Sequence, residues 1–310
     1  MTIPSELAAA GPLQGPAGER GLVFGCAGDD LVGILHPGGA GASVGMLVVV
    51  GGPQYRVGSH RQFVLLARFL AACGIPVLRF DYRGMGDSAG DPRDFERITG
   101  DLSAAVDAFR QAVPTVQRVV LWGLCDAATA AACYAPGDRR VCGLVLLNPW
   151  VRTVEGAAQA HLRHYYHRRL LQPDFWRKLA SLRFDFRRSW RSFRDLVQRS
   201  GWLAAREGAV ADAPLPVRLA EALDAFAGDC LVILSGNDLT AAEFRDCIAA
   251  SPGWQKLMSR PTITRLDLVA ADHTFSRRDW RDQVARWTAD WVNARWPAPG
   301  STRGRDSDPR

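Results

Sequence analysis

Long apolar runs are missing from this 310-residue chain, and none approaches the roughly 18 to 20 residues that a membrane-spanning helix needs. The N-terminus, MTIPSELAAAGPLQGPAGER, also lacks the basic start and the apolar core of a secretory signal peptide. The seven cysteines contain no C-x-x-C pair and leave an odd one over, so a disulfide framework fits poorly. Together these absences favour a cytoplasmic protein in a reducing compartment.

Signatures of nucleotide and metal binding are missing as well. No G-x-G-x-x-G turn with an acidic partner follows a strand, and no P-loop lysine motif is present, so a nucleotide cofactor is not expected. The segment HLRHYYH does place His161, His164 and His167 at i, i+3 and i+6. That spacing drifts around a helix and no cysteine or carboxylate cluster accompanies it, which favours a solvated or lipid-facing helix over zinc ligation. The sequence therefore predicts neither a cofactor nor a metal ion.

The chain does contain a regular alternation of apolar strands and helical patterns. The runs MLVVVGG, IPVLRFDYRG, RVVLWG, CGLVLLNP and CLVILSGND are continuously apolar, which is typical of strands buried on both faces of a parallel sheet. Helical patterns such as HRQFVLLARFLAACG and DLSAAVDAFRQAV lie between them, and an antiparallel hairpin, GLVFGC with LVGILHP, precedes them. We therefore predict an α/β fold with a mostly parallel central sheet and helices on both faces.

One segment interrupts this alternation. Residues 152–206 carry twelve Arg and one Lys against four acidic residues, a charge of +9 that leaves the rest of the chain at −3. Such asymmetry marks a separate functional segment. The expected division is a flexible N-terminus at 1–19, an α/β core at 20–149 and 227–296, a helical cap insertion at 150–226 and a disordered tail at 297–310.

The interleaved Arg and aromatic residues of the expected insertion have three interpretations. Nucleic acid binding is disfavoured, because no recognition motif is present and the rest of the chain is acidic. A basic amphipathic face that touches anionic lipid or a lipid-linked substrate fits the pattern. A cap with its apolar face over an active site fits best, and it is compatible with lipid contact. We thus expect no nucleic acid partner, and peripheral membrane contact through the basic cap.

Four separated segments carry the candidate chemistry. Three of them are VVVGGPQYRVGS, FDYRGMGDS and the turn VVLWGLCDAATAA. The fourth is the C-terminal region, where VILSGNDLTAAEF is followed by LVAADHTFSRRDW. In this order they resemble the α/β-hydrolase superfamily over roughly residues 20–296. The turn is similar to the nucleophile elbow G-x-S-x-G, with Cys125 in place of serine and Ala127 in place of the last glycine. Residues 123 and 127 have to be small, because strand and helix approach closely there.

The resemblance implies a role for each matching position. Cys125 would be the nucleophile, and the backbone amides of Asp126 and Gln54 would form the oxyanion hole, since Pro53 has no N–H. The helix N-terminus should favour a thiolate at Cys125, whereas the adjacent Asp126 carboxylate should oppose it. The sequence alone leaves open which effect is larger.

The acid and the base follow in the order that the superfamily uses. Asp238 comes after the penultimate predicted strand and His273 after the last, which gives a Cys125, Asp238, His273 triad suited to acyl transfer. Asn148 sits where some members carry the acid but has no charge, and Asp272 is too close along the chain to orient the neighbouring ring. Asp81, Arg83 and Ser88 of FDYRGMGDS are interpreted as loop scaffolding.

Within the superfamily, GLCDAATAA, GGPQYRVGSHRQF, DYRGMGDS and ADHTFS look most like the hydrolases associated with the exosortase A system (type 1). That resemblance implies an esterase- or thioesterase-like enzyme linked to exopolysaccharide biosynthesis, acting on a small-molecule or lipid-linked acyl substrate. A thioester intermediate exchanges with thiols, alcohols and amines, so acyl transfer to a glycan or lipid-linked acceptor competes with hydrolysis as the expected reaction. A non-catalytic binding protein with this fold is the rival class.

Overall fold

The computed structural model describes residues 18–52, 54–151 and 213–297. The chain divides into two compact units, one formed by residues 1–150 and 219–310 and the other by residues 151–218. Most of the second unit lies outside the described residues, as do His161, His164 and His167. The expected cap at 150–226, and nearly all of the expected flexible termini, therefore stay predictions.

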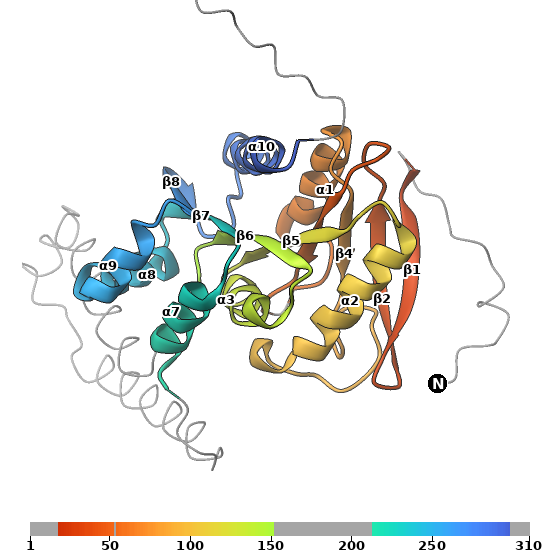
Figure 1. Ribbon diagram of the computed structural model, residues 1–310, viewed down its shortest axis with the longest axis horizontal. Coiled ribbons are helices and arrows are strands. Elements are labelled where there is room, and N and C mark those ends of the chain that lie inside the picture. The colour runs from red at the N-terminus through yellow and green to blue at the C-terminus, as the bar shows by residue number, and fades with distance from the viewer. Residues whose placement is uncertain (1–17, 53, 152–212, 298–310) are drawn as a thin grey trace, which may run out of the picture. The chain divides into compact units, whose positions relative to one another are not determined.

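An eight-stranded sheet forms the centre of the first unit, in the order β1-β2-β4-β3-β5-β6-β7-β8 (Figure 1). The strands β1 and β2 form the predicted antiparallel hairpin, and β2 also pairs antiparallel with β4. All the remaining pairs are parallel. The strands are β1 (Arg20–Cys26), β2 (Asp29–His36), β3 (Val44–Val49), β4 (Val77–Phe80), β5 (Arg118–Leu124), β6 (Val141–Leu147), β7 (Asp229–Asn237) and β8 (Ile263–Asp272).

Helices cover both faces of this sheet, as the alternation predicted. In Figure 1, α1 and α10 lie on one face, and α2 and α3 lie on the other. The described helices are α1 (Gln62–Ala72), α2 (Thr99–Ala112), α3 (Asp126–Tyr134), α7 (Leu215–Ala225), α8 (Leu239–Ala250), α9 (Pro252–Met258) and α10 (Arg278–Arg295), with short 3-10 turns at Ser59–Arg61, Phe95–Arg97 and Ala135–Gly137. Among them, no helix has the length and apolar character to cross a bilayer.

The continuous apolar runs are explained by their burial. Every residue of β3, β4 and β6 is buried, because helices close both faces of the central strands. One large apolar cluster joins Val48 and Trp122 of the sheet to Phe63 of α1 and Trp291 of α10. The edge strand β8 instead alternates in burial and exposes Val269.

The turn from β5 into α3 depends on a close approach of strand and helix. A Cβ at Gly123 would lie 2.6 Å from the backbone carbon and oxygen of Ala127 and 2.7 Å from the nitrogen of Ala128. Those atoms belong to the helix backbone and cannot rotate away. The prediction that position 123 has to be small is confirmed.

We therefore expect Gly123→Ala to lower the free energy of unfolding by about 1 to 3 kcal/mol, since the methyl group would push α3 off the sheet. Urea denaturation measures this change. Gly137→Ala is the control: Gly137 is exposed, and a Cβ there meets no other atom of the described chain within 4 Å, so its effect should stay within about 0.5 kcal/mol. Equal losses in the two variants would contradict the close approach.

Candidate active site

Cys125 occupies a strained turn between β5 and α3. Its backbone has φ 63° and ψ −124°, a conformation that a non-glycine residue adopts rarely and that is typical of a nucleophile elbow. The turn is held from the neighbouring strand, because the Cys125 amide donates to the carbonyl of Leu147 at 2.9 Å. The Cys125 carbonyl in turn accepts from the amide of Trp150 at 3.2 Å. The half-buried thiol therefore stands at a defined position at the carboxyl end of β5.

The pairing of β7 with β8 brings the candidate acid and base together. In that parallel register Asn237 lies opposite Asp272, so the next residue of each strand, Asp238 and His273, leaves the sheet at the same point. The Nδ1 atom of His273 lies 3.0 Å from Oδ1 of Asp238. Two residues 35 positions apart along the chain are thus placed side by side by strand pairing.

Backbone amides fix the orientation of the Asp238 carboxylate. Asp238 is the N-cap of α8, where its oxygens accept from the amides of Thr240 at 3.3 Å and Ala241 at 3.0 Å. Burial opposes its ionisation, but the hydrogen bonds from His273 and from these two amides outweigh burial and lower the pKa of Asp238. The carboxylate is therefore charged and aimed at the imidazole.

The imidazole of His273 joins the acid to the thiol. It hydrogen-bonds to Asp238 and to Cys125, and these two bonds raise the pKa of His273 from 6.5 to about 10 against the opposing effect of burial. The carboxylates of Asp126 and Asp272 add attraction for a positive ring. The Asp272 side chain itself turns to Ser276, and its Oδ1 atom accepts a hydrogen bond from the Ser276 amide at 2.9 Å. At neutral pH the raised pKa favours an imidazolium at His273, between the Asp238 carboxylate and the Cys125 sulfur.

The Asp126 side chain turns toward the loop after β3. One carboxylate oxygen accepts from the Gly52 amide at 2.8 Å and the other from the Ala127 amide at 2.9 Å. A Cβ at Gly51 would lie 2.1 Å from this carboxylate, which explains why that position is a glycine. Burial raises the pKa of Asp126 despite the hydrogen bonds from the amides. The sequence interpretation missed this contact, although the adjacent Gly51-Gly52 pair was a signal of a close approach.

The two predicted oxyanion donors lie in these same segments. The Asp126 amide begins α3 directly after Cys125, where the sequence placed it, and it also faces its own carboxylate. Gln54 follows Pro53, which lies outside the described residues, and its buried side-chain Oε1 has no hydrogen-bond partner in the described part of the chain. The oxyanion role of both amides stays a prediction.

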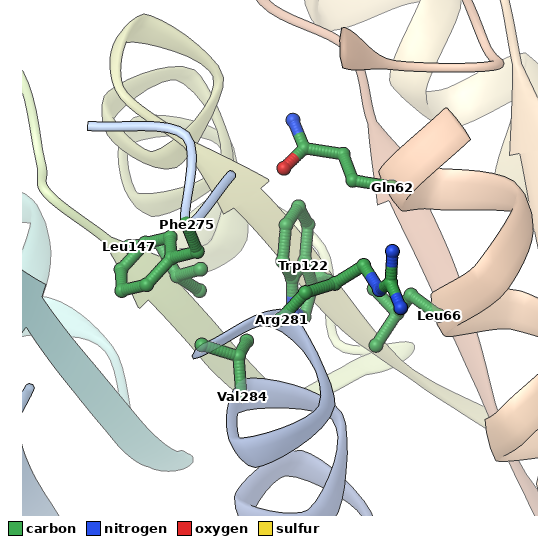
Figure 2. Close-up of a pocket in the computed structure, with 7 residues that line it drawn as sticks. All are labelled: Gln62, Leu66, Trp122, Leu147, Phe275, Arg281 and Val284. Atoms are coloured by element: carbon green, nitrogen blue, oxygen red, sulfur yellow. The ribbon is translucent and has the colours of Figure 1, made fainter. Parts of the chain in front are cut away.

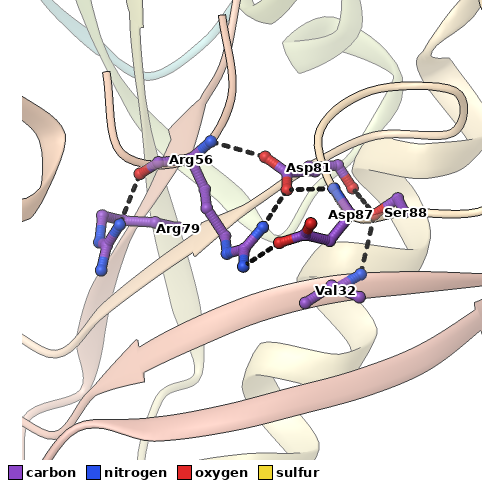
Figure 3. A network of polar contacts seen from close by, with 6 residues as sticks. All are labelled: Val32, Arg56, Arg79, Asp81, Asp87 and Ser88. Atoms are coloured by element: carbon purple, nitrogen blue, oxygen red, sulfur yellow. Dashed lines mark hydrogen bonds and ion pairs between the residues drawn. The ribbon is translucent and has the colours of Figure 1, made fainter. Parts of the chain in front are cut away.

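A buried ionic network ties the loop after β3 to the loop after β4 (Figure 3). Asp81 is fully buried and accepts from the Arg56 amide at 2.6 Å, the Asp87 amide at 3.1 Å and the Arg56 guanidinium. The Ser88 hydroxyl donates to the backbone carbonyl of Asp81 at 2.6 Å and accepts from the amide of Val32 in β2 at 2.8 Å. Arg83 pairs with Asp101 at 2.9 Å. These contacts fit the interpretation of FDYRGMGDS as scaffolding, and Arg56 is the partner that sequence reasoning missed.

A small pocket lies between the sheet and the helices α1 and α10 (Figure 2). Its empty volume is about 250 Å³, a figure that includes space open to solvent. Its lining is mostly apolar and consists of Gln62, Leu66, Trp122, Leu147, Phe275, Arg281 and Val284. Cys125 packs against the apolar cluster that supplies most of these side chains. No group of three or more His, Cys, Asp or Glu that could hold a metal occurs among the residues that the structure describes.

Known structures share this architecture. The chain is similar to the Pyrococcus furiosus esterase Pf2001, with 14% identity, a TM-score of 0.60 and 96% of each chain covered. It is similar to a dienelactone hydrolase from Anabaena variabilis, with 15% identity, a TM-score of 0.56 and coverage of 89% of this chain and 97% of that one. A ferulic acid complex of Est1E from Butyrivibrio proteoclasticus gives 16% identity, a TM-score of 0.58 and coverage of 88% and 98%. No curated protein matches the sequence.

The sheet order, the elbow and these likenesses define the α/β-hydrolase fold. Within that class, residues 45–204, just over half of the chain, match the family described as serine aminopeptidase, S33, and the chain belongs to that family. The description names a serine enzyme, whereas the elbow of this chain carries Cys125.

Cys125 should be the fastest thiol to react with iodoacetamide at pH 7, because it is hydrogen-bonded to the His273 imidazolium. Cys73, an exposed residue, is the internal control, since partial desolvation of its thiol and the charge of Asp290 raise its pKa. We expect labelling of Cys125 to be at least about tenfold faster, and His273→Gln to remove that advantage. Peptide mass spectrometry over time measures both rates. Equal rates at the two thiols of the wild type would contradict this prediction.

The raised pKa of His273 also has a consequence for folding. Because the folded-state pKa of about 10 exceeds the ordinary 6.5, the contribution of the imidazolium to stability is complete below about pH 6.5 and is lost as the pH rises through about 10. The stability advantage of the wild type over His273→Gln should therefore shrink between pH 7 and pH 10. Denaturant unfolding at both pH values tests this, and an unchanged difference would argue against the ion pair.

Proposed function

We propose that the chain is an esterase- or thioesterase-like hydrolase in which Cys125, His273 and Asp238 act as a triad on an acyl ester or thioester. The observation that carries the proposal is the imidazole of His273, which is hydrogen-bonded to the Cys125 thiol and lies 3.0 Å from the Asp238 carboxylate. Nucleophile, base and orienting acid are the three groups that covalent acyl transfer requires.

In the first step the Cys125 thiolate, formed when the thiol proton passes to His273, attacks the acyl carbonyl carbon, the C–S bond forms and the carbonyl π electrons move to oxygen. The backbone amides of Asp126, at the N-terminus of α3, and of Gln54, in the loop after β3, are assigned to stabilise that oxyanion. The oxyanion collapses, the bond to the leaving alkoxide or thiolate breaks, and His273 gives its proton to the leaving group. An acyl thioester on Cys125 and a neutral imidazole remain.

In the second step water attacks the thioester. The Cys125 hydrogen bond is one of the two that raise the pKa of His273, so acylation of the sulfur removes that bond and lowers the pKa. The imidazole, which has just given up its proton, then stays neutral more readily and can accept a proton from water. His273 takes a proton from the attacking water, the C–S bond breaks, and the acid leaves with the thiolate–imidazolium pair restored. Asp238 holds the ring through both steps and exchanges no proton.

Transfer to a glycan or lipid-linked acceptor is the second candidate reaction. It is favoured by the sulfur nucleophile, since an alcohol or amine can replace water in attack on a thioester. Adding a sugar alcohol or an amine to the assay separates the two reactions: transfer gives a new ester or amide, whereas hydrolysis gives the free acid alone.

The sequence resemblance indicates the biological process in which we propose that this reaction takes place. GLCDAATAA and DYRGMGDS are similar to the hydrolases of the exosortase A system, so we place the reaction in exopolysaccharide biosynthesis in the cytoplasm. The charge of +9 over residues 152–206 suits peripheral contact with anionic lipid, or with a lipid-linked acyl substrate.

Mutant kinetics on short-chain aryl esters and acyl thioesters test the triad. We expect Cys125→Ala and His273→Ala each to lower kcat/KM by about 10³-fold or more, and the double variant to be scarcely worse than either, because the residues act as a unit. Asp238→Asn should cost less. Cys73→Ala, which removes an exposed thiol, should leave turnover unchanged.

Turnover that survives Cys125→Ala would refute the mechanism. A wild-type chain that is inactive on every acyl donor but binds one of them would instead support a non-catalytic binding protein of this fold.

A further inference from the structure

Asn148 occupies an unusual position at the end of β6. It is fully buried, and its backbone has φ 44°, in the left-handed region that asparagine tolerates better than most residues. Its amide donates to the carbonyl of Ile233 in β7 at 3.1 Å. A buried polar residue in a costly backbone conformation persists only when its surroundings determine it strongly.

Its side-chain amide makes three hydrogen bonds to two other segments. The Nδ2 atom donates to Ser235 Oγ at 2.8 Å and to the backbone carbonyl of His273 at 3.1 Å. The Oδ1 atom accepts from the Ser235 amide at 2.9 Å. Ser235 is buried in β7, three residues before Asp238. One amide thus connects the strand that carries the acid to the residue that carries the imidazole.

A neutral amide can make this whole set of contacts, whereas an ionised carboxylate cannot. The His273 carbonyl and the Ser235 amide need a donor and an acceptor from the same side chain, and a carboxylate offers acceptors alone. An ionised aspartate would place an oxygen, with no proton to donate, against the carbonyl oxygen of His273 and would bury a charge. This explains in physical terms why a position that could carry an acid holds asparagine while Asp238 pairs with the imidazole.

We infer that Asn148 is a positioning residue for His273: its side-chain amide, held by the backbone N–H of Ser235, fixes the backbone of His273 so that the imidazole meets both Asp238 and Cys125. The inference rests on the proposed function, since it assigns Asn148 to the base of that triad. It also makes a claim about the ring itself, which can be measured without any substrate.

The test uses Asn148→Gly, because glycine adopts φ 44° without strain and removes only the side chain. Ser235→Ala is the matched control: it deletes one buried hydrogen bond to Asn148 but leaves the bond from Asn148 to His273. The readout is the His273 imidazole titration by NMR from pH 5 to 10.5, assigned with His273→Gln. The second readout is kcat/KM on an acyl thioester.

We expect Asn148→Gly to lower the pKa of His273 from about 10 toward 6.5 and to reduce kcat/KM by at least about tenfold, since small misplacement of a catalytic group is costly. Ser235→Ala should reduce thermal stability but keep the His273 titration and kcat/KM within about twofold of the wild type. Equal effects of the two variants, or a His273 pKa that stays near 10 in Asn148→Gly, would overturn the inference.

Asn148→Asp keeps the size of the side chain and covers the case in which Asn148→Gly does not fold. It should also lower kcat/KM by at least about tenfold, and activity equal to the wild type would count against the inference.

Different measurements decide the proposed function and the positioning role of Asn148. A wild type without acyl turnover would remove the proposed function, while the shift of the His273 titration would still decide the positioning role.

Discussion

The hydrogen bond between His273 and Asp238 depends on one pairing of strands, that of β7 with β8. The register that sets Asn237 opposite Asp272 delivers an acid and an imidazole to the same edge of the sheet. The elbow at Cys125 is held to the neighbouring strand by its amide bond to Leu147. Residues from three distant segments therefore meet because parallel strands end at a common edge, which is where sheets of this class place their chemistry.

A thiol at the elbow changes the electrostatics of the site. The imidazole of His273 is already positive at neutral pH, so its proton is available to a leaving group before substrate arrives. The Asp126 carboxylate next to the sulfur would oppose a thiolate, but its charge is directed to the amides of Gly52 and Ala127. That contact reduces its repulsion of the sulfur and at the same time fastens the loop after β3 to the start of α3.

The sequence predicted the parts of the site that follow from strand ends. Cys125, Asp238 and His273 each follow the end of a predicted strand, and the carboxyl ends of parallel strands share one edge of the sheet. The sequence pattern did not predict the directions of the side chains. Nothing in the periodicity shows that Asp126 turns to Gly52, or that the amide of Asn148 reaches the carbonyl of His273. These contacts depend on rotamers and on segments more than 70 residues apart.

The central claim is that Cys125 carries the acyl group, and intact-protein mass spectrometry after rapid mixing with an acyl thioester tests it most directly. The account predicts a mass increase equal to one acyl group, mapped to the peptide that contains Cys125, absent from Cys125→Ala and longer-lived in His273→Ala if that variant is first acylated by an activated donor. Turnover of the thioester with no acyl group on Cys125 at any time, or acylation of another residue at the rate of turnover, would contradict it.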